Sequence, residues 1–381
     1  MASIRKRTLP SGKTVWLAAY LDGAGKRRFK QFARKAEADA FLVTVRSQVA
    51  AGVHTPDSVS ITVKEAADLW LERCERDKLE ETTLRQYRAH VNLHIVPRIG
   101  ATKLSRLTTP AVNAFADQLI ADGRSADMAK RVLRSLSAIV AEAKRRGLAA
   151  MNHVRDATPI KRSKRGEARP EMPSKAELKA MIDAAQDRER PFLFTAIFTG
   201  LRASELRGLK WKDIDLKKGI LHVRRRVDRF NQFGPPKSAA GTRDIPLTPI
   251  LLKTLKEWRL ACPNGELELV FPTGAGNVES HGNILSRLFW PLQIRAGVVN
   301  MVDRKDAEGR DVKMPDAKYS LHALRHAAAA LWIEQGLSPK RIQSLMGHSS
   351  IQQTFDTYGY LFEARDDDKA AMAAVEIGLL S

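Results

Sequence analysis

A polar segment near the middle of the chain limits the folds that this sequence can adopt. From Arg155 to Pro173 the sequence turns basic and contains three prolines, which favours an extended connection over a packed element. The 381 residues are enough for two or three domains, each with its own core. We therefore expect separate domains on the two sides of a basic linker that spans residues 155–172.

The charge of the chain points to a polyanionic partner. Its formal net charge is +21 and its isoelectric point is about 10.1, and it has no long apolar run or lipid-anchor signal that would favour a membrane. Ribosomal and other RNA-binding proteins share this composition, so it indicates nucleic acid without choosing DNA. The N-terminus lacks the apolar stretch of a signal peptide, and neither Cys74 nor Cys262 has a partner at metal-ligand spacing. A cytoplasmic protein is the simplest interpretation.

The first 56 residues predict a small sheet covered by one helix. Alternation indicates strands at 4–8, 14–20 and 27–32, and an apolar stripe indicates a helix over 35–50. The opposite face of the sheet is basic. Its residues are Arg5, Arg7, Lys26, Arg28 and Lys30. This face is either a solvated surface or a surface that reads DNA in the major groove.

Residues 57–154 predict a helical domain. Thr62 and Glu65 form a capping box at the start of one helix, and Thr109 precedes Pro110 as the N-cap of another. An apolar stripe from Val132 to Ala143 indicates a third helix. The exposed side of these helices carries eight basic residues. They are Arg85, Arg88, Lys130, Arg131, Arg134, Lys144, Arg145 and Arg146. This side either faces solvent or lines a phosphate backbone.

The residues after the linker, 173–381, predict a domain with helices and a small sheet. A second capping box, Ser174 with Glu177, begins its first helix. The other expected elements are a buried helix over 192–198, strands over 220–227 and 242–247, and helices from about Pro249 to the end. The last of these helices begins near Asp368. The whole chain is therefore mainly α with small β-sheets.

Several side chains of this last domain suit the binding of a phosphate diester. Arg202 and Arg325 each present a planar fork that matches two phosphate oxygens. His322, Arg325 and His326 share a helical face, because Arg325 and His326 lie three and four residues after His322. Two histidines at this spacing also suit zinc, but the sequence lacks the glutamate of a His-Glu-x-x-His site. A neutral imidazole can instead donate to a phosphate oxygen or move a proton.

A lysine and a tyrosine complete the set of reactive groups. Lys237 lies on the turn between the two expected strands, where it is either a solubilising residue or a general acid for a departing alkoxide. Tyr358 is the expected nucleophile, and nearby cations would have to stabilise its phenolate because a phenol has a pKa near 10. Tyr360 lies two residues further on, so chemistry alone does not choose between them. For each tyrosine, a place in the core is the alternative interpretation.

Four motifs, in this order, resemble those of the tyrosine recombinase (phage integrase) family. They are TGLRASEL at 199–206, Lys237 ahead of TRDIPL at 242–247, HALRH at 322–326, and MGHSSI at 346–351 followed by Thr357-Tyr358-Gly359. The resemblance covers about residues 173–365. Met346 replaces the usual leucine and Tyr360 a frequent histidine, and neither departure touches a catalytic position of the family.

The resemblance implies a reaction and a role for each residue. Tyr358 would attack the scissile phosphate, form a 3′-phosphotyrosyl link and release a 5′-hydroxyl. The implied catalytic residues are Arg202, Lys237, His322, Arg325, His348 and Tyr358. Glu205 would orient the first arginine. A 5′-hydroxyl of a partner strand then attacks in turn, so the family requires neither ATP nor a divalent metal as a cofactor.

The resemblance also implies a function and a layout. The chain would be a site-specific recombinase that integrates or excises a mobile element, with an arm-type DNA-binding domain at 1–56, a core-binding domain at 57–154 and a catalytic domain at 173–381. Expected partners are double-stranded DNA attachment sites, three further copies in a tetramer, a DNA-bending host factor and an excision factor, at the nucleoid. The C-terminal helix packs either on its own domain or on a neighbouring protomer.

Two other functions fit the same motifs less well. One is a type IB topoisomerase-like relaxase that uses the same chemistry on supercoils. The other is a non-catalytic DNA-binding regulator on the same fold. The presence of all the expected catalytic residues argues against the regulator.

The arginine at the start of the TGLRASEL motif gives the first testable prediction. Arg202→Ala removes a fork that would hold the phosphate in the transition state, so the variant should keep site-specific DNA binding and lose covalent adduct formation. Gel shift and adduct assays on the same DNA measure the two properties. An equal loss of both would make Arg202 a binding or folding residue instead.

Overall fold

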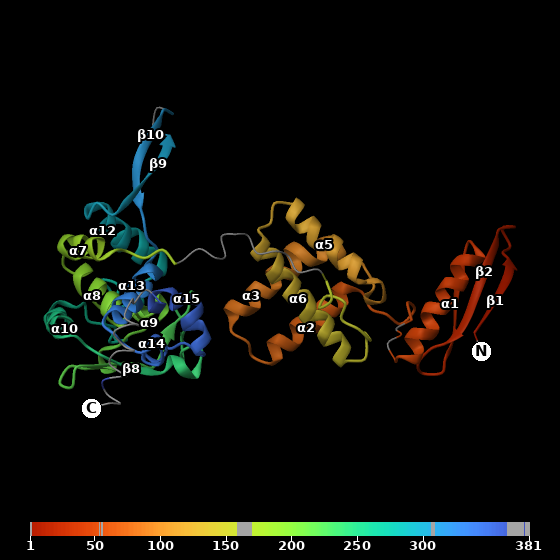
Figure 1. The fold of residues 1–381 in the computed structure, drawn as a ribbon, viewed down its shortest axis with the longest axis horizontal. Coiled ribbons are helices and arrows are strands. Elements are labelled where there is room, and N and C mark those ends of the chain that lie inside the picture. Colours follow the sequence, from red (N-terminus) through yellow and green to blue (C-terminus); the bar gives the residue numbers. More distant parts are fainter. Residues whose placement is uncertain are drawn as a thin grey trace. The chain divides into compact units, whose positions relative to one another are not determined.

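The chain divides into two compact units, residues 1–167 and 168–381 (Figure 1). The structure, a computed structural model, describes residues 2–52, 54, 56–157, 170–305, 309–363 and 377. Most of the expected basic linker lies outside these residues, and so does the expected helix from Asp368, except for Ile377. The expected domain boundaries at residues 56, 154 and 172 stay predictions.

The N-terminal sheet matches the sequence pattern closely. Its strands, β1 (Ser3–Thr8), β2 (Thr14–Leu21) and β3 (Arg27–Phe32), are antiparallel in the order β1-β2-β3. Helix α1 (Lys35–Ala50) lies along one face (Figure 1). Ala18, Tyr20 and Leu42 are buried between them, which confirms that the helix covers an otherwise unsupported small sheet.

Helices dominate the rest of the first unit. They are α2 (Val63–Arg76), α3 (Glu81–Ala89), a π-helical turn (His90–Ile95), α4 (Val96–Ile99), α5 (Thr109–Ala121) and α6 (Ala126–Arg145). The capping box of Thr62 and Glu65 is confirmed. The N-cap of α5 is Thr108 and not Thr109, because Thr108 keeps an extended backbone and its hydroxyl accepts from the Ala111 N–H at 3.4 Å.

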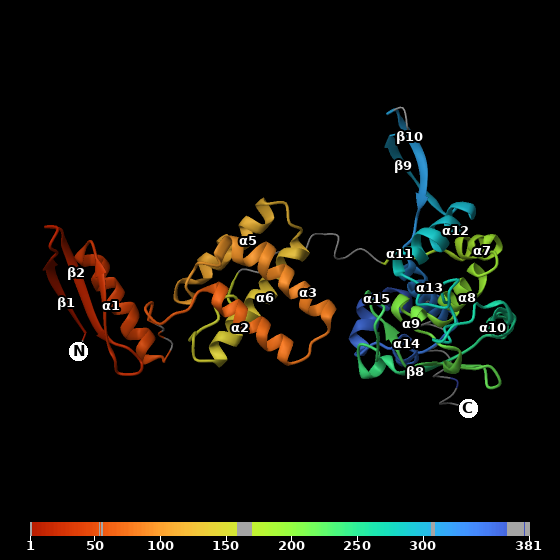
Figure 2. The ribbon, with the colours of Figure 1, turned by 180° about the vertical axis from the view of Figure 1, so that it is seen from behind.

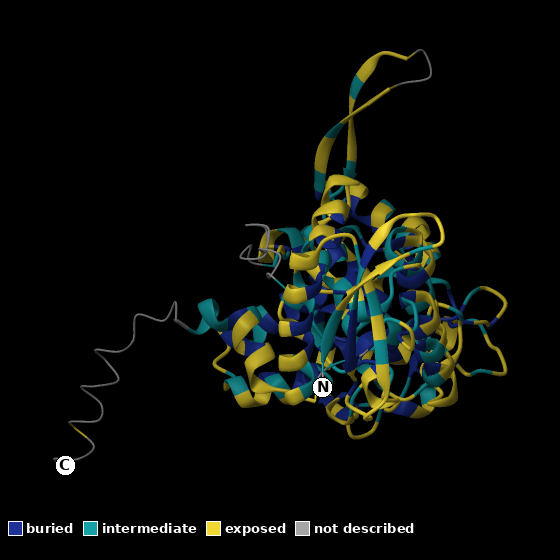
Figure 3. Ribbon diagram, turned by 90° about the vertical axis from the view of Figure 1, so that its right-hand side faces the viewer, coloured by how far each residue is buried: buried dark blue, intermediate teal, exposed yellow. Residues whose placement is uncertain are grey.

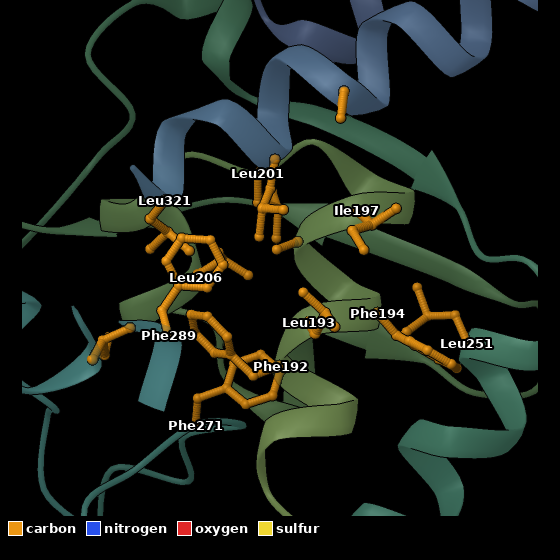
Figure 4. Packing of buried hydrophobic residues seen from close by; sticks show 14 of the residues in the cluster. Phe192, Leu193, Phe194, Ile197, Leu201, Leu206, Leu251, Phe271, Phe289 and Leu321 are labelled. Atoms are coloured by element: carbon orange, nitrogen blue, oxygen red, sulfur yellow. The ribbon is translucent and has the colours of Figure 1, made fainter. Parts of the chain in front are cut away.

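The second unit is built around a buried helix. Its helices are α7 (Lys175–Ala184), α8 (Glu189–Thr199), α9 (Ala203–Arg207), α10 (Pro249–Ala261), α11 (His281–Ile284), α12 (Trp290–Arg295), α13 (Leu321–Glu334), α14 (Pro339–Met346) and α15 (Ile351–Glu363). A π-helical turn (Leu285–Phe289) joins α11 to α12. Phe192, Leu193 and Ile197 of α8 are buried in the main core (Figure 4). The prediction of a buried helix is therefore confirmed.

The small sheet of this unit differs in part from the expectation. Strands β4 (Ile214–Asp215), β5 (Ile220–Val223) and β8 (Arg243–Pro246) pair in the order β4-β5-β8. The expected strand over 220–227 breaks after Val223, and β6 (Arg226–Val227) pairs with β7 (Phe233–Gly234) instead. The residues that would continue the β5–β8 ladder opposite Arg224 to Arg226 include Ala239–Gly241, which form a single 3₁₀ turn and not an extended strand, so the pairing ends at Val223 and Arg243.

A long hairpin contradicts the expectation of helices from Pro249 to the end. Strands β9 (Val299–Lys305) and β10 (Asp311–Ala317) pair over seven residues each and extend away from the rest of their unit (Figures 1 and 2). Most of the hairpin is exposed (Figure 3). The prediction was wrong because β-branched valines favour strands here, and Gly309, with φ +79°, favours a turn. Few large apolar residues mark a buried face, so the segment gave a weak strand pattern.

The described helices give no sign of a transmembrane segment. None of them combines the length and the apolar character that a bilayer crossing requires.

Two glycines after helices of the second unit allow a matched stability test. Gly200 and Gly297 both have left-handed backbones, with φ of +58° and +69°, so alanine should cost about 1 kcal/mol at either position. A Cβ at Gly200 would also lie 3.2 Å from the side chains of Ala328 and Trp332, whereas a Cβ at Gly297 would meet nothing within 4 Å. We expect Gly200→Ala to lower the free energy of unfolding by about 2 kcal/mol or more. Urea unfolding measures both, and equal losses would contradict the packing argument.

Candidate active site

Two glycine turns bring the predicted arginines together. Gly200 ends α8 and Gly347 ends α14, and both adopt a left-handed conformation. The Arg325 guanidinium on α13 donates to the Gly200 carbonyl at 2.5 Å and also to the carbonyl of Met346. The Arg202 guanidinium, at the start of α9, donates to the Gly347 carbonyl at 3.1 Å. The two guanidiniums are therefore fixed on the same pair of turns.

The two arginines differ in their exposure. The side chain of Arg202 is 29% exposed, whereas Arg325 as a whole is 3% exposed. Burial, and then the charge of Arg202, lowers the pKa of Arg325 to about 9. Arg325 is still charged at neutral pH, so the site holds two cations side by side. An anion that reaches the exposed fork of Arg202 would relieve their repulsion.

A buried carboxylate supports this arrangement. Glu205 accepts from the Arg202 guanidinium at 2.8 Å and from the Arg202 backbone N–H at 3.0 Å. Its other partner is Arg243 of β8, which donates to the two carboxylate oxygens at 2.9 and 3.2 Å. Burial acts to raise the pKa of Glu205, but Arg243 and Arg202 outweigh it and hold this pKa below its ordinary value. The expected contact of Glu205 with the first arginine is present.

Arg243 is a site residue that was not predicted from the sequence. The signal was available, because alternation along 242–247 places Arg243 on the same side of the strand as the buried Ile245. An inward arginine requires a buried partner, and Glu205 is that partner.

The structure places Tyr358 among the histidines. Tyr358 is 1% exposed, and its hydroxyl and Nδ1 of His326 form a hydrogen bond of 2.9 Å. The ring of His348 stacks on the phenol with 6.4 Å between centroids. Burial raises the pKa of Tyr358 to about 12, although Arg325 and Arg202 act to lower it. In this resting arrangement the phenol is neutral and shielded from solvent.

Two of the three motif histidines, His326 and His348, contact this phenol, and the third, His322, contacts His326. His322 and His326 contact each other edge to face, with ring centroids 4.7 Å apart, and His348 hydrogen-bonds through Nδ1 to the Thr354 hydroxyl at 2.9 Å. Burial first, and then neighbouring cations or histidines, lowers the pKa values of His326 and His348 to about 4 each. Both imidazoles are therefore neutral at pH 7. In the described ranges, no three His, Cys, Asp or Glu side chains gather as metal ligands.

Lys237 lies on a loop next to the site and is not fixed in the site by a described contact. It is exposed on the loop between β7 and β8, and its side chain makes no hydrogen bond or ion pair with any described residue. The end of the same loop reaches the second glycine turn, because a Cβ added at Gly347 would lie 3.0 Å from the Ala240 carbonyl oxygen. The structure thus groups five of the six predicted catalytic residues and leaves the lysine on an adjacent loop.

Eight of the thirteen basic residues on these two faces are the expected DNA contacts, and they fall into two groups. Four already have acidic partners: Arg28 with Asp22, Lys30 with Asp57, Arg85 with Glu81, and Arg88 with Glu75 and Glu81. The other four make no ion pair with any residue in the described part of the chain. They are Arg5, Arg7, Lys130 and Arg134. All eight stay predictions, and the second group has charge available for a phosphate backbone.

Comparison with known proteins identifies the class to which this fold and site belong. Residues 173–365 match the phage integrase family, and residues 63–159 match the phage integrase central domain. The chain therefore belongs to the phage integrase family. It is a tyrosine-type site-specific recombinase, of the class that integrates mobile elements.

Individual relatives agree with this assignment. The chain is 29% identical to the prophage integrase IntR of Escherichia coli K12 over 56% of this chain and 53% of that protein, so the match spans about half of that relative. It is 26% identical to a XerC-like tyrosine recombinase of Caldanaerobacter subterraneus subsp. tengcongensis, over 89% of this chain and 90% of the relative.

Solved structures share the fold. One is the Tn1549 transposon integrase in complex with a circular intermediate DNA, with a TM-score of 0.66, 19% identity, and coverage of 83% of this chain and 99% of that one. Another is a lambda integrase tetramer bound to a Holliday junction, with a TM-score of 0.55, 22% identity, and coverage of 92% and 94%. The expected fold class is confirmed.

The lowered histidine pKa values predict how stability depends on pH. A histidine with a folded pKa near 4 and an unfolded pKa near 6.5 takes up a proton on unfolding between these values. The free energy of unfolding should therefore fall as the pH drops from about 6.5 towards 4, by at most about 1.4 kcal/mol per pH unit for each histidine. Urea unfolding from pH 4.5 to 7.5 measures the slope. The slope should be smaller in a His326→Gln/His348→Gln variant, and an unchanged slope would contradict the prediction.

Proposed function

We propose that this protein cleaves DNA at an attachment site through Tyr358. The phenol oxygen forms a bond to the scissile phosphorus, and the bond from phosphorus to the 5′ oxygen breaks. The resulting 3′-phosphotyrosyl link conserves the free energy of the broken phosphodiester bond. The departing 5′ oxygen takes a proton from Lys237. The observation that supports this proposal is the hydrogen bond of the Tyr358 hydroxyl to His326, the residue that follows Arg325 on α13, with Arg325 and Arg202 held on the same glycine turns.

The two arginines have the geometry to stabilise the transition state. Their forks can donate to non-bridging oxygens, whose negative charge grows when phosphorus becomes five-coordinate. The neutral imidazoles of His322 and His348 add donors without adding charge. Glu205 keeps Arg202 in place before the DNA arrives, so little reorganisation is needed during the reaction.

The resting tyrosine must change before it reacts. With a pKa of about 12, ionising Tyr358 at pH 7 costs about 7 kcal/mol. Its hydroxyl is also held by His326 in a buried position. We infer that binding of the DNA moves the phenol out of its buried position and that its proton passes to a neutral imidazole of the site as the bond to phosphorus forms. An unbound protein with an unreactive nucleophile would not damage DNA at random.

The partners of the reaction follow from the same proposal. Double-stranded DNA attachment sites are the substrate, and a tetramer on DNA would pair two of them. A solved structure with the same fold, a lambda integrase tetramer bound to a Holliday junction, supports a tetramer on DNA. The C-terminal helix from Asp368 would dock on a neighbouring protomer. A DNA-bending host factor and an excision factor would set the direction, and the protein would act at the nucleoid.

A nicked duplex with its attachment site tests the proposal in EDTA. Wild-type protein and Tyr360→Phe should form a covalent adduct that survives denaturation, because both keep the Tyr358 hydroxyl that hydrogen-bonds to His326. Tyr358→Phe should bind the duplex equally well and form no adduct. Denaturing gels measure the adduct, and gel shifts measure the binding.

Three outcomes would contradict the proposal. They are an adduct that persists in Tyr358→Phe, an adduct that depends on magnesium, and relaxation of any supercoiled plasmid without a specific site. The last outcome would indicate a type IB topoisomerase-like relaxase.

A further inference from the structure

Arg243 connects three parts of the site that come from different regions of the chain. Besides the two bonds to Glu205, its guanidinium donates to the Gly241 carbonyl at 2.9 Å and to the Leu345 carbonyl at 2.6 Å. Leu345 lies in the last turn of α14, two residues before Gly347. A single side chain thus joins the support of Arg202, the loop of Lys237 and the turn that precedes His348.

The surroundings leave this guanidinium no freedom to serve another role. Its side chain is 4% exposed, so a phosphate cannot reach it directly. A Cβ at Gly347 would lie 3.0 Å from its Nη1 and 3.2 Å from its Cδ, so the chain packs closely around it. Four acceptor contacts fix the position and orientation of a buried guanidinium. Arg243 must therefore act through the groups that it holds.

The hydrogen bond from Arg243 to the Gly241 carbonyl holds one end of the Lys237 loop. No described residue fixes the side chain of Lys237, so its position is set by the backbone from Pro236 to Gly241. Gly241 packs tightly on the start of this loop, because a Cβ there would lie 2.5 Å from Cβ of Pro236. The bond from Arg243 to the Gly241 carbonyl closes the loop at its other end.

We propose that Arg243 is a positioning residue for the general acid: through the Gly241 carbonyl it holds the Lys237 loop against the glycine turn that anchors Arg202. The inference rests on the proposed function of Lys237. When Tyr358 attacks, the bond from phosphorus to the 5′ oxygen breaks, and that oxygen takes a proton from the Lys237 ammonium. A displaced loop leaves the oxygen to depart unprotonated, and general acid catalysis typically contributes 10² to 10⁴-fold.

The simpler role for Arg243 is to neutralise Glu205. In that case the loss of Arg243 would disturb Arg202 and weaken the stabilisation of negative charge on the phosphate. Protonation of the leaving 5′ oxygen would not be affected. The two roles predict different responses to the chemistry of the leaving group, so a change of one atom in the DNA separates them.

The probe is an attachment-site duplex with sulfur in place of the bridging 5′ oxygen of the scissile phosphate. Its sequence can be recovered from DNA that the wild-type protein captures covalently. In this duplex the bond from phosphorus to sulfur breaks and a thiolate departs, which requires no proton because a thiol has a pKa near 8.5. Single-turnover rates of adduct formation are compared on the oxygen and sulfur duplexes.

Arg243→Lys is the main variant, because lysine keeps a charge for Glu205 but cannot span all four contacts. We expect a loss of about 100-fold or more on the oxygen duplex and a rate within about threefold of wild type on the sulfur duplex. Lys237→Ala should show the same pattern. Arg202→Lys is the matched control, and it should lose rate on both duplexes because it holds the phosphate rather than the leaving group.

Gly241→Ala keeps the side chain of Arg243 and tests the loop alone. The new methyl group would push on Pro236 and displace the Lys237 loop without touching Glu205. The same rescue by sulfur is expected. This variant also serves if Arg243→Lys fails to fold, which circular dichroism and thermal melting would show.

Each outcome decides a different point. Equal losses on both duplexes for Arg243→Lys, or an unchanged rate for Gly241→Ala on the oxygen duplex, would overturn the role of Arg243 while leaving that of Lys237 intact. If the wild-type protein forms no adduct, or if Lys237→Ala is not rescued by sulfur, the proposed function itself fails.

Discussion

The buried ion pair of Glu205 with two arginines is the interaction on which the site depends. A carboxylate that is 3% exposed would be unstable if it were unpaired, because removing one charge from water costs several kcal/mol. Arg202 and Arg243 supply the missing charge from α9 and β8. The pair therefore fixes two regions about 40 residues apart in the sequence, since a buried pair tolerates little change in its geometry. Removing either arginine would leave the buried Glu205 carboxylate with one cation fewer, and the contact between α9 and β8 would be destabilised.

In the proposed function, the balance of charge suits a site for a single phosphate. Three guanidiniums face one carboxylate, so the cluster of Arg202, Arg243, Arg325 and Glu205 carries an excess of two positive charges. This excess contributes to lowering the pKa of His348, which stays neutral, and of Arg325. A phosphate diester brings one negative charge in the ground state and more in the transition state. The excess charge is thus matched better to the transition state than to the bound substrate.

The sequence predicted local structure and chemistry well, and long-range geometry poorly. The N-terminal strands and α1 followed from alternation and an apolar stripe, because both signals are local. The residue types of the site followed from the phosphate chemistry and the family motifs. The role of Arg243 did not, because its partner lies 38 positions earlier. The hairpin of β9 and β10 was missed since it is exposed on most of its length and has no apolar periodicity.

The burial of Tyr358 could not be read from the motifs either, and it changes how the other residues should be understood. The phenol fills a small core with Ile333, Ile342 and Met346, so it stabilises the resting fold as an apolar group. The same burial raises its pKa and makes it a poor nucleophile. Moving it towards a phosphate forfeits this packing, and contacts between the DNA and the protein have to offset that cost. In the proposed reaction only a bound site supplies those contacts, so the selectivity of cleavage would arise from the energy needed to expose Tyr358, in addition to the affinity for the sequence.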